Sequence, residues 1–201
     1  YIQSNISTDK YKYVTGGTNP QSGIKLGAEM LTADGLDRTF TTTVDGIQLT
    51  GKRTPVIILV TDGEPTYYYP NQTATGDRYG NGSGSNENYY YWTIRTAKYY
   101  KEQVTAKYYG TTSEQAKMFT IGIGLDGTLA KTMLKPSKAN VDVCKNSGEY
   151  SEERKLYNLL NSSEAPYIYD YADGTASGAL TETDIQNFLN TSISASSESL
   201  D

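Results

Sequence analysis

Two short segments carry oxygen groups of the kind that bind a hard divalent cation. Thr18 lies on a Gly-Gly-Thr-Asn turn before a predicted helix, and Asp62 follows a predicted strand within Thr-Asp-Gly-Glu-Pro. Mg²⁺ takes an octahedron of oxygens and keeps several waters, so a hydroxyl and a carboxylate supply part of its shell. Either segment alone has an ordinary structural explanation, as a helix start or a strand-ending turn. Together they predict a Mg²⁺ site at Thr18 and Asp62, with Mn²⁺ or Ca²⁺ as alternatives.

A tyrosine-rich segment, residues 67–91, follows Asp62 and contains few aliphatic side chains. Structureless segments of this length usually carry function or are disordered. Tyrosine supplies contact area with a polar tip, which suits an exposed binding face. We therefore expect this segment to stand beside the metal site and to form its specificity surface, with a disordered insertion as the alternative. The candidate ligand-binding residues are Glu64, Tyr67, Tyr68 and Tyr69.

Composition excludes several classes of function. The 201 residues are 36% hydrophobic and 20% charged, which is typical of one globular domain. The net charge is −5, and no basic stripe suggests nucleic-acid binding. No apolar run approaches the roughly 20 residues that span a bilayer. We expect neither a nucleic-acid partner nor a membrane span in this chain.

The chain has no histidine and one cysteine, Cys144. These counts exclude catalysis by an imidazole base, His-ligated zinc and an internal disulfide bond. We therefore expect a binding module and not an enzyme. Low cysteine content fits a cytosolic protein or a surface protein of a Gram-positive bacterium, and the abundance of tyrosine favours the extracellular surface.

The first predicted elements are a helix and a buried strand. Asn19 and Pro20 suit the N-cap and first position of a helix that continues to about residue 33. Residues 36–54 form a connecting loop or a small hairpin, with Asp45-Gly46 as the turn. Residues 55–60 are a continuous β-branched run, which is typical of a strand covered on both faces by helices.

The remaining elements alternate along the chain. We expect helices at 91–109, 129–134, 152–160 and 183–189, and strands at 118–123 and 167–169. This order predicts an α/β fold, a doubly wound and mostly parallel sheet with helices on both faces. Ligands bind such sheets at the carboxyl ends of the strands, which is where Asp62 lies.

Four segments in this order carry a resemblance to a known family. They are Gly16-Gly-Thr-Asn-Pro-Gln-Ser-Gly-Ile24, Val56-Ile-Ile-Leu-Val-Thr-Asp-Gly-Glu-Pro65, Met118-Phe-Thr-Ile-Gly-Ile-Gly124 and Tyr167-Ile-Tyr-Asp170. Over most of residues 14–190 the chain resembles the von Willebrand factor A-type (vWA) domain. The resemblance implies a metal-ion-dependent adhesion site in which Thr18 is the hydroxyl ligand and Asp62 the carboxylate. It also implies a protein ligand that completes the metal shell with its own acidic oxygen.

One motif of the family is missing from this sequence. The Asp-x-Ser-x-Ser loop has no counterpart, since Ser83-Gly-Ser85 and residues 192–199 lack the Asp and the preceding strand. The chain thus resembles the C-terminal part of a vWA domain at residues 1–190, followed by a Ser-rich tail at 191–201. We expect the N-terminal half to come from the sequence before Tyr1 or from another chain, unless the fold is degenerate. Without that half, metal affinity should be low.

Three functions remain open from the sequence. The first is adhesion or recognition of a host or matrix protein by a bacterial surface or pilus-type protein. The second is assembly of a surface fibre through a neighbouring subunit, with a structural or vestigial metal site. The third is a nicotinamide enzyme that uses the G-x-G-x-x-G pattern of residues 122–127, which the short helix before Pro136 disfavours. Asp170 and Asp173 could also bind Ca²⁺, although a solvated turn is the favoured explanation for them.

Overall fold

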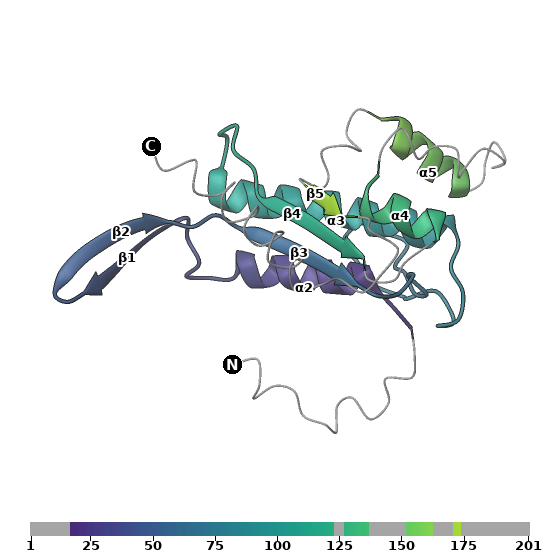
Figure 1. Ribbon diagram of the computed structural model, residues 1–201, viewed down its shortest axis with the longest axis horizontal. Coiled ribbons are helices and arrows are strands. Elements are labelled where there is room, and N and C mark those ends of the chain that lie inside the picture. Colours follow the sequence, from purple (N-terminus) through teal and green to yellow (C-terminus); the bar gives the residue numbers. More distant parts are fainter. Residues whose placement is uncertain (1–16, 123–126, 137–151, 163–170, 174–201) are drawn as a thin grey trace, which may run out of the picture.

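The computed structural model describes residues 17–122, 127–136, 152–162 and 171–173. In this part of the chain a small parallel sheet lies on a layer of helices, and a two-stranded hairpin extends from one end (Figure 1). The architecture is therefore mixed α/β, as expected. The predicted strand at 167–169, the helix at 183–189 and the tail at 191–201 lie outside the described residues.

Three parallel strands form the sheet, in the order β3-β4-β5. Strand β3 is Val56–Thr61, β4 is Lys117–Gly122 and β5 is Tyr171–Asp173. Val56 lies beside Lys117 and Thr61 beside Gly122, so the two long strands run in register along their whole length. The prediction that these two apolar segments are adjacent parallel strands is confirmed.

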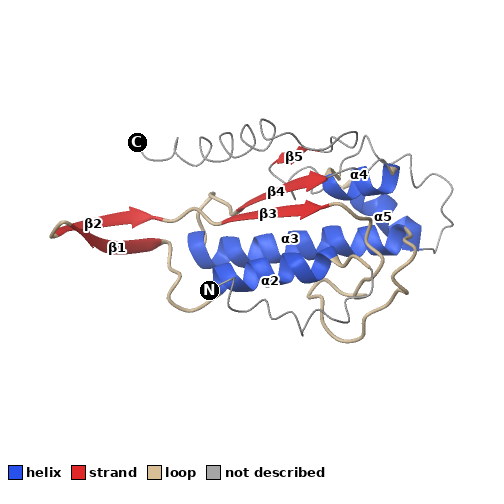
Figure 2. Ribbon diagram, turned by 60° about the horizontal axis from the view of Figure 1, so that its bottom comes forward, coloured by secondary structure: helices blue, strands red, loops and turns tan. Residues whose placement is uncertain are grey.

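Two helices cover one face of this sheet (Figure 2). Helix α2, Pro20–Thr32, packs Ile24 and Ala28 against the sheet and against α3, which is Glu87–Tyr109. The shorter helices α4, Thr128–Leu134, and α5, Glu152–Asn161, contact α3. The core comprises fully buried side chains from all of these elements, among them Ile24, Ile94, Val104, Met118, Met133 and Leu156.

Side-chain caps define where the two long helices begin. Asn19 accepts a hydrogen bond from the Ser22 backbone N–H at 3.3 Å, with Pro20 at the first helical position, as predicted. Asn86 caps α3 in the same way by accepting from the Asn88 N–H at 3.0 Å. Helix α3 therefore begins at Glu87, before the predicted start at residue 91, and the tyrosine-rich segment is correspondingly shorter.

The two long strands differ in how their faces are covered. In β4, Met118 belongs to the main core, while Phe119 and Ile121 form a second cluster with Val56. In β3, Ile57 and Leu59 are buried, but Ile58 and Val60 on the opposite face are 39% and 54% exposed. The prediction of burial on both faces is thus wrong for β3, because no described helix lies over Ile58 and Val60. A complete doubly wound sheet is not present in the described residues.

The segment between α2 and β3 is a hairpin, one of its two predicted forms. Strand β1, Thr39–Val44, pairs antiparallel with β2, Ile47–Lys52. Asp45 and Gly46 have φ of 51° and 79°, and positive φ at both turn positions matches the twist of a two-residue hairpin. At the base, the Arg53 N–H donates to the Arg38 carbonyl at 2.6 Å, so the two ends of the hairpin meet.

Candidate functional site

Backbone hydrogen bonds hold Thr18 against the loop that follows β3. The Thr18 carbonyl accepts from the N–H groups of Thr66 at 2.8 Å and Tyr67 at 3.2 Å, and the Thr18 N–H donates to Thr66 Oγ1 at 2.8 Å. Thr18 and Pro65 consequently form a parallel bridge. This bridge brings together the two loops that the sequence singled out, at the carboxyl end of β3.

Gly63 allows the Thr18 hydroxyl to approach the turn that follows Asp62. A methyl group placed on Gly63 would lie 2.6 Å from Thr18 Oγ1, so only glycine leaves room for this approach. Thr61 shapes the same turn, since its Oγ1 donates to the Gly63 carbonyl at 2.9 Å. Asp62 itself is exposed, and its carboxylate forms no hydrogen bond or ion pair with the described residues. A hydroxyl and a free carboxylate therefore flank one turn.

Glu64 is turned towards the protein and joins three segments. Its Oε2 accepts a hydrogen bond from Ser85 Oγ at 2.9 Å, and Ser85 Oγ lies 2.8 Å from the hydroxyl of Tyr90. Its Oε1 lies so close to Gly127 that any side chain there would collide with it. Burial raises the pKa of Tyr90 well above its ordinary value, and the Ser85 hydrogen bond opposes this only in part.

Tyr67 stands next to Thr18 with a cation on its ring. The Arg78 guanidinium lies 4.0 Å from the centre of the Tyr67 ring. The ring also lies against Gly17, whose φ is 142° and where a Cβ atom would overlap the Tyr67 ring. Tyr67 is half-buried by these two neighbours. Its ring thus forms a wall of the turn that carries Thr18.

Tyr68 is the centre of a small aromatic cluster. Its ring centre lies 5.8 Å from that of Tyr79 and 4.7 Å from that of Tyr89. Tyr68 and Tyr79 also exchange two backbone hydrogen bonds, of 2.9 and 2.8 Å. Tyr79 is 51% exposed, so one edge of this cluster is open to a ligand.

A buried glutamine that the sequence analysis did not single out anchors Tyr69. Gln21 on α2 is fully buried, and its Oε1 accepts from the Tyr69 N–H at 2.7 Å. Its Nε2 lies within 3.3 Å of the Tyr69 carbonyl, 3.2 Å of the Asn71 carbonyl and 2.8 Å of Thr96 Oγ1. No sequence pattern marks Gln21, because its position on the helix resembles any polar residue of a first turn.

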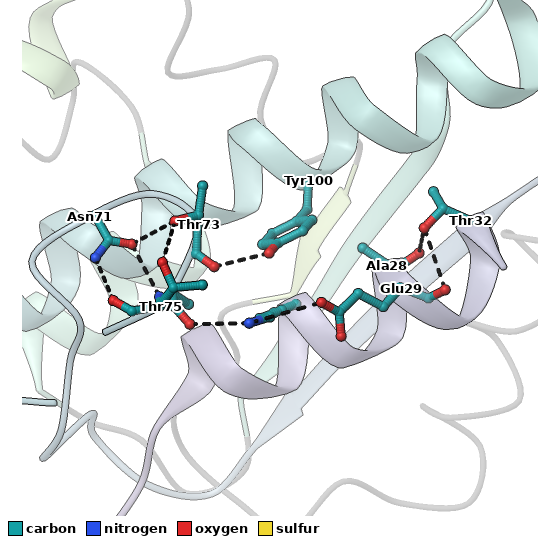
Figure 3. A network of polar contacts seen from close by, with 9 residues as sticks. Ala28, Glu29, Thr32, Asn71, Thr73, Thr75 and Tyr100 are labelled. Carbon is teal, nitrogen blue, oxygen red and sulfur yellow. Dashed lines mark hydrogen bonds and ion pairs between the residues drawn. The ribbon is translucent and has the colours of Figure 1, made fainter. Parts of the chain in front are cut away.

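The turn that follows is held by a second polar network (Figure 3). Asn71 Oδ1 accepts from Thr73 Oγ1 at 2.9 Å, and Asn71 Nδ2 donates to the Thr75 carbonyl at 2.7 Å. The Tyr100 hydroxyl of α3 donates to the Thr73 carbonyl at 3.0 Å, and Lys25 of α2 donates to the Ala74 carbonyl. Residues 67–75 are therefore fastened to both long helices. The segment has no helix or strand before α3, as predicted, but this part of it is held to the body by hydrogen bonds.

The site offers few metal ligands by itself. The described residues contain no group of three or more His, Cys, Asp or Glu side chains that could hold a metal ion. The oxygen atoms that fit a hard cation are the Thr18 hydroxyl and the Asp62 carboxylate, while Glu64 is engaged with Ser85. Asp170 lies outside the described residues, as do residues 123–126 of the glycine pattern. In the same described ranges, no helix is both long and apolar enough to cross a bilayer.

Comparison of the chain with protein-family models, curated proteins and solved structures gives no match. The resemblance to vWA domains therefore rests on the motifs around Thr18 and Asp62 and on their order along the chain. The parallel pairing of β3 with β4 agrees with that order.

Proposed function

We propose that this chain is a divalent-cation-dependent binding module that recognises a protein ligand at the carboxyl end of β3. The observation that supports it most directly is the bridge between Thr18 and Pro65, which holds the Thr18 loop against the turn that carries the exposed Asp62. Thr18 Oγ1 and the Asp62 carboxylate would hold Mg²⁺, and water and an acidic group of the ligand would supply the other oxygens. A bound cation would give an acidic group of the ligand a direct contact with a divalent charge.

A further segment is part of this proposal, because two side chains form only part of an octahedral shell. Among the described strands β3 lies at the edge of the sheet, and this edge and the exposed residues Ile58 and Val60 offer a place for an additional strand and its cover. In the vWA family the strand that precedes the Asp-x-Ser-x-Ser loop would carry the missing ligands. It would come from another part of the polypeptide or from a second chain.

Specificity would reside in the aromatic surface next to Thr18. Tyr67 with Arg78, and Tyr68 with Tyr79, present rings and a guanidinium group beside the proposed metal. Tyrosine and arginine are enriched among the residues that dominate binding energy at protein interfaces. An extracellular adhesin on a bacterial surface is the setting that this combination fits best.

A second candidate is an assembly module of a surface fibre, in which any metal is structural. The observation that favours it is the β1–β2 hairpin, which extends from the body (Figure 1). Its side chains Val44, Ile47 and Leu49 are exposed. Exposed apolar side chains grouped in one place are typical of contacts between protein subunits. The two candidates use different surfaces and are tested separately.

The proposed metal site is tested with Mn²⁺, whose paramagnetism broadens nearby NMR signals. We expect Mn²⁺ to broaden signals of residues around Thr18 and Asp62 selectively, with a dissociation constant above about 1 mM, the weak end of the range for extracellular sites. Asp62→Ala should abolish this broadening, whereas Asp77→Ala, an exposed carboxylate in the same segment, should leave it unchanged. Broadening that survives Asp62→Ala, or that spreads evenly over acidic residues, would refute the site.

A further inference from the structure

The β1–β2 hairpin has two faces of different chemistry. Residues paired across the two strands share a face, and the faces alternate along the hairpin. One face carries the apolar pairs Phe40/Gly51, Thr42/Leu49 and Val44/Ile47. The other carries the polar pairs Thr39/Lys52, Thr41/Thr50 and Thr43/Gln48. The hairpin is therefore amphipathic, like two strands of a β-sandwich that turn one face to the core and the other to solvent.

The apolar face has no cover within the described part of the chain. Val44 is 50% exposed, Ile47 64% and Leu49 48%. Strands β1 and β2 make their extensive contacts with each other, and both views show them reaching beyond the helices (Figures 1 and 2). A lone two-stranded hairpin is marginally stable in water, and an apolar face on a projecting arm usually marks an interaction site. A partner that covers this face would stabilise the arm.

Charges of opposite sign mark the two ends of the apolar face. Asp45 lies in the turn at the tip. Arg53 lies at the base, where its guanidinium stands 4.6 Å from the Phe40 ring centre and donates to the Asp37 carbonyl at 2.7 Å. With six residues in each strand, the face is about 20 Å long. Two such faces laid antiparallel over their full length would bring each tip to the base of the other.

We propose that the apolar face docks on the same face of a second copy of this chain, related by a two-fold axis. Antiparallel packing sets Asp45 of each copy beside Arg53 of the other, whereas parallel packing would set Asp45 against Asp45. Thr42 and Leu49 then lie at the axis, opposite their own counterparts. Phe40 of each copy receives Val44 and Ile47 of the other.

The size of the face determines how strong this association is. Two six-residue strands cover far less than the roughly 800 Å² per partner of a standard interface. Free molecules would therefore associate weakly. Copies held side by side on a surface or in a fibre would associate through their high effective concentration. The inference is independent of the metal site.

Cross-linking of single cysteine variants tests the arrangement. Cys144→Ser removes the native thiol, and Thr42→Cys then places a thiol on the apolar face near the axis. A bis-maleimide with a reach of about 10 Å, the spacing of two stacked sheets, should link two Thr42→Cys chains at about 1 mM protein. Thr41→Cys, the neighbouring residue on the polar face, is the matched control and should link at least about tenfold more slowly, because its thiols lie on opposite outer surfaces.

Two further variants identify the forces involved. Ile47→Lys in the Thr42→Cys chain should reduce linking to the rate of the control, and Asp45→Lys should reduce it and remove its dependence on salt. Equal linking at positions 41 and 42 would overturn the proposal in favour of edge-to-edge pairing. Slow linking at both positions, with a sedimentation coefficient that does not change with concentration, would also overturn the proposal that a second copy covers this face.

Discussion

Gln21 of α2 forms a two-way hydrogen-bonded pair with the backbone of Tyr69, accepting from its N–H at 2.7 Å and donating to its carbonyl at 3.3 Å. The side-chain amide thus bonds both backbone groups of Tyr69, as a neighbouring strand would. The pairing fixes the chain three residues beyond Thr66, which itself is bonded to Thr18. One buried side chain thus fixes the backbone of the tyrosine-rich segment at Tyr69.

Gln21→Leu should destabilise the fold by about 2–4 kcal/mol, since it leaves the buried polar groups of Tyr69, Asn71 and Thr96 without this partner. The free energy of unfolding in urea measures the effect. Gln103→Leu, an exposed glutamine on α3, is the control and should change stability by less than about 0.5 kcal/mol. A neutral Gln21→Leu would mean that water or a rearranged segment replaces the amide.

Tyr90 should make the free energy of unfolding decrease at alkaline pH. Burial raises its pKa in the folded protein above the ordinary value of 10.0, so the unfolded chain loses this proton first. The associated stability is complete below about pH 10 and is lost as pH rises towards the folded pKa, with a slope of up to about 1.4 kcal/mol per pH unit for one proton. Tyr100, Tyr108 and Tyr109 shift in the same direction.

Unfolding measured from pH 8 to pH 11 tests this dependence. Tyr90→Phe should flatten the decline above pH 10 and cost about 1 kcal/mol at neutral pH, because Ser85 loses a hydrogen-bond partner. An unchanged slope in Tyr90→Phe would show that the other tyrosines dominate it.

Gly63→Ala should damage the proposed metal site more than the fold. The added methyl would stand 2.6 Å from Thr18 Oγ1 and would push the hydroxyl away from Asp62, so Mn²⁺ affinity should fall at least about tenfold. The steric cost to stability should be about 1–3 kcal/mol. Gly84→Ala meets no atom within 4 Å and should be silent in both measurements. If Gly63→Ala binds Mn²⁺ with wild-type affinity, the Thr18 hydroxyl is not a metal ligand.

Thr18→Val removes the hydroxyl and keeps the shape of the side chain. The bonds that fasten Thr18 to Thr66 and Tyr67 come from its backbone, so the melting temperature should change by no more than a few degrees. Mn²⁺ affinity should fall, but less than in Asp62→Ala, because a neutral hydroxyl contributes less to a hard cation than a carboxylate. A larger loss in Thr18→Val than in Asp62→Ala would contradict the assigned roles.

Local signals in the sequence predicted the elements that depend on neighbouring residues. Asn19-Pro20 marks the start of α2, and Asp45-Gly46 marks the turn of the hairpin, because each acts through the backbone of adjacent residues. The β-branched run of β3 predicted a parallel strand. It could not show which face is covered, since Ile58 and Val60 have the same chemistry as the buried Ile57 and Leu59.

Long-range contacts were the part that could not be predicted. The lack of aliphatic residues after Asp62 suggested a loose loop, whereas polar bonds from Gln21, Lys25 and Tyr100 hold it. The pattern of hydrophobic residues in the sequence does not indicate such hydrogen bonds. The motifs did predict that the loops of Thr18 and Asp62 meet, while the hydrogen bond of Glu64 comes from Ser85, a residue of an otherwise featureless Gly-Ser stretch.

Arg38 and Arg53 meet at the base of the hairpin, so the length of the hairpin can change without a change in the body of the protein. Because the arm leaves and re-enters the body at one hydrogen bond, residues can be added to it without moving α2 or β3. Side chains alternate between the faces, so additions must come as two residues in each strand if Val44 and Ile47 are to keep their side. Each such step would carry the turn about 7 Å farther out. The length of the arm can therefore change only in fixed steps, and it would set the distance between neighbouring molecules in the same steps.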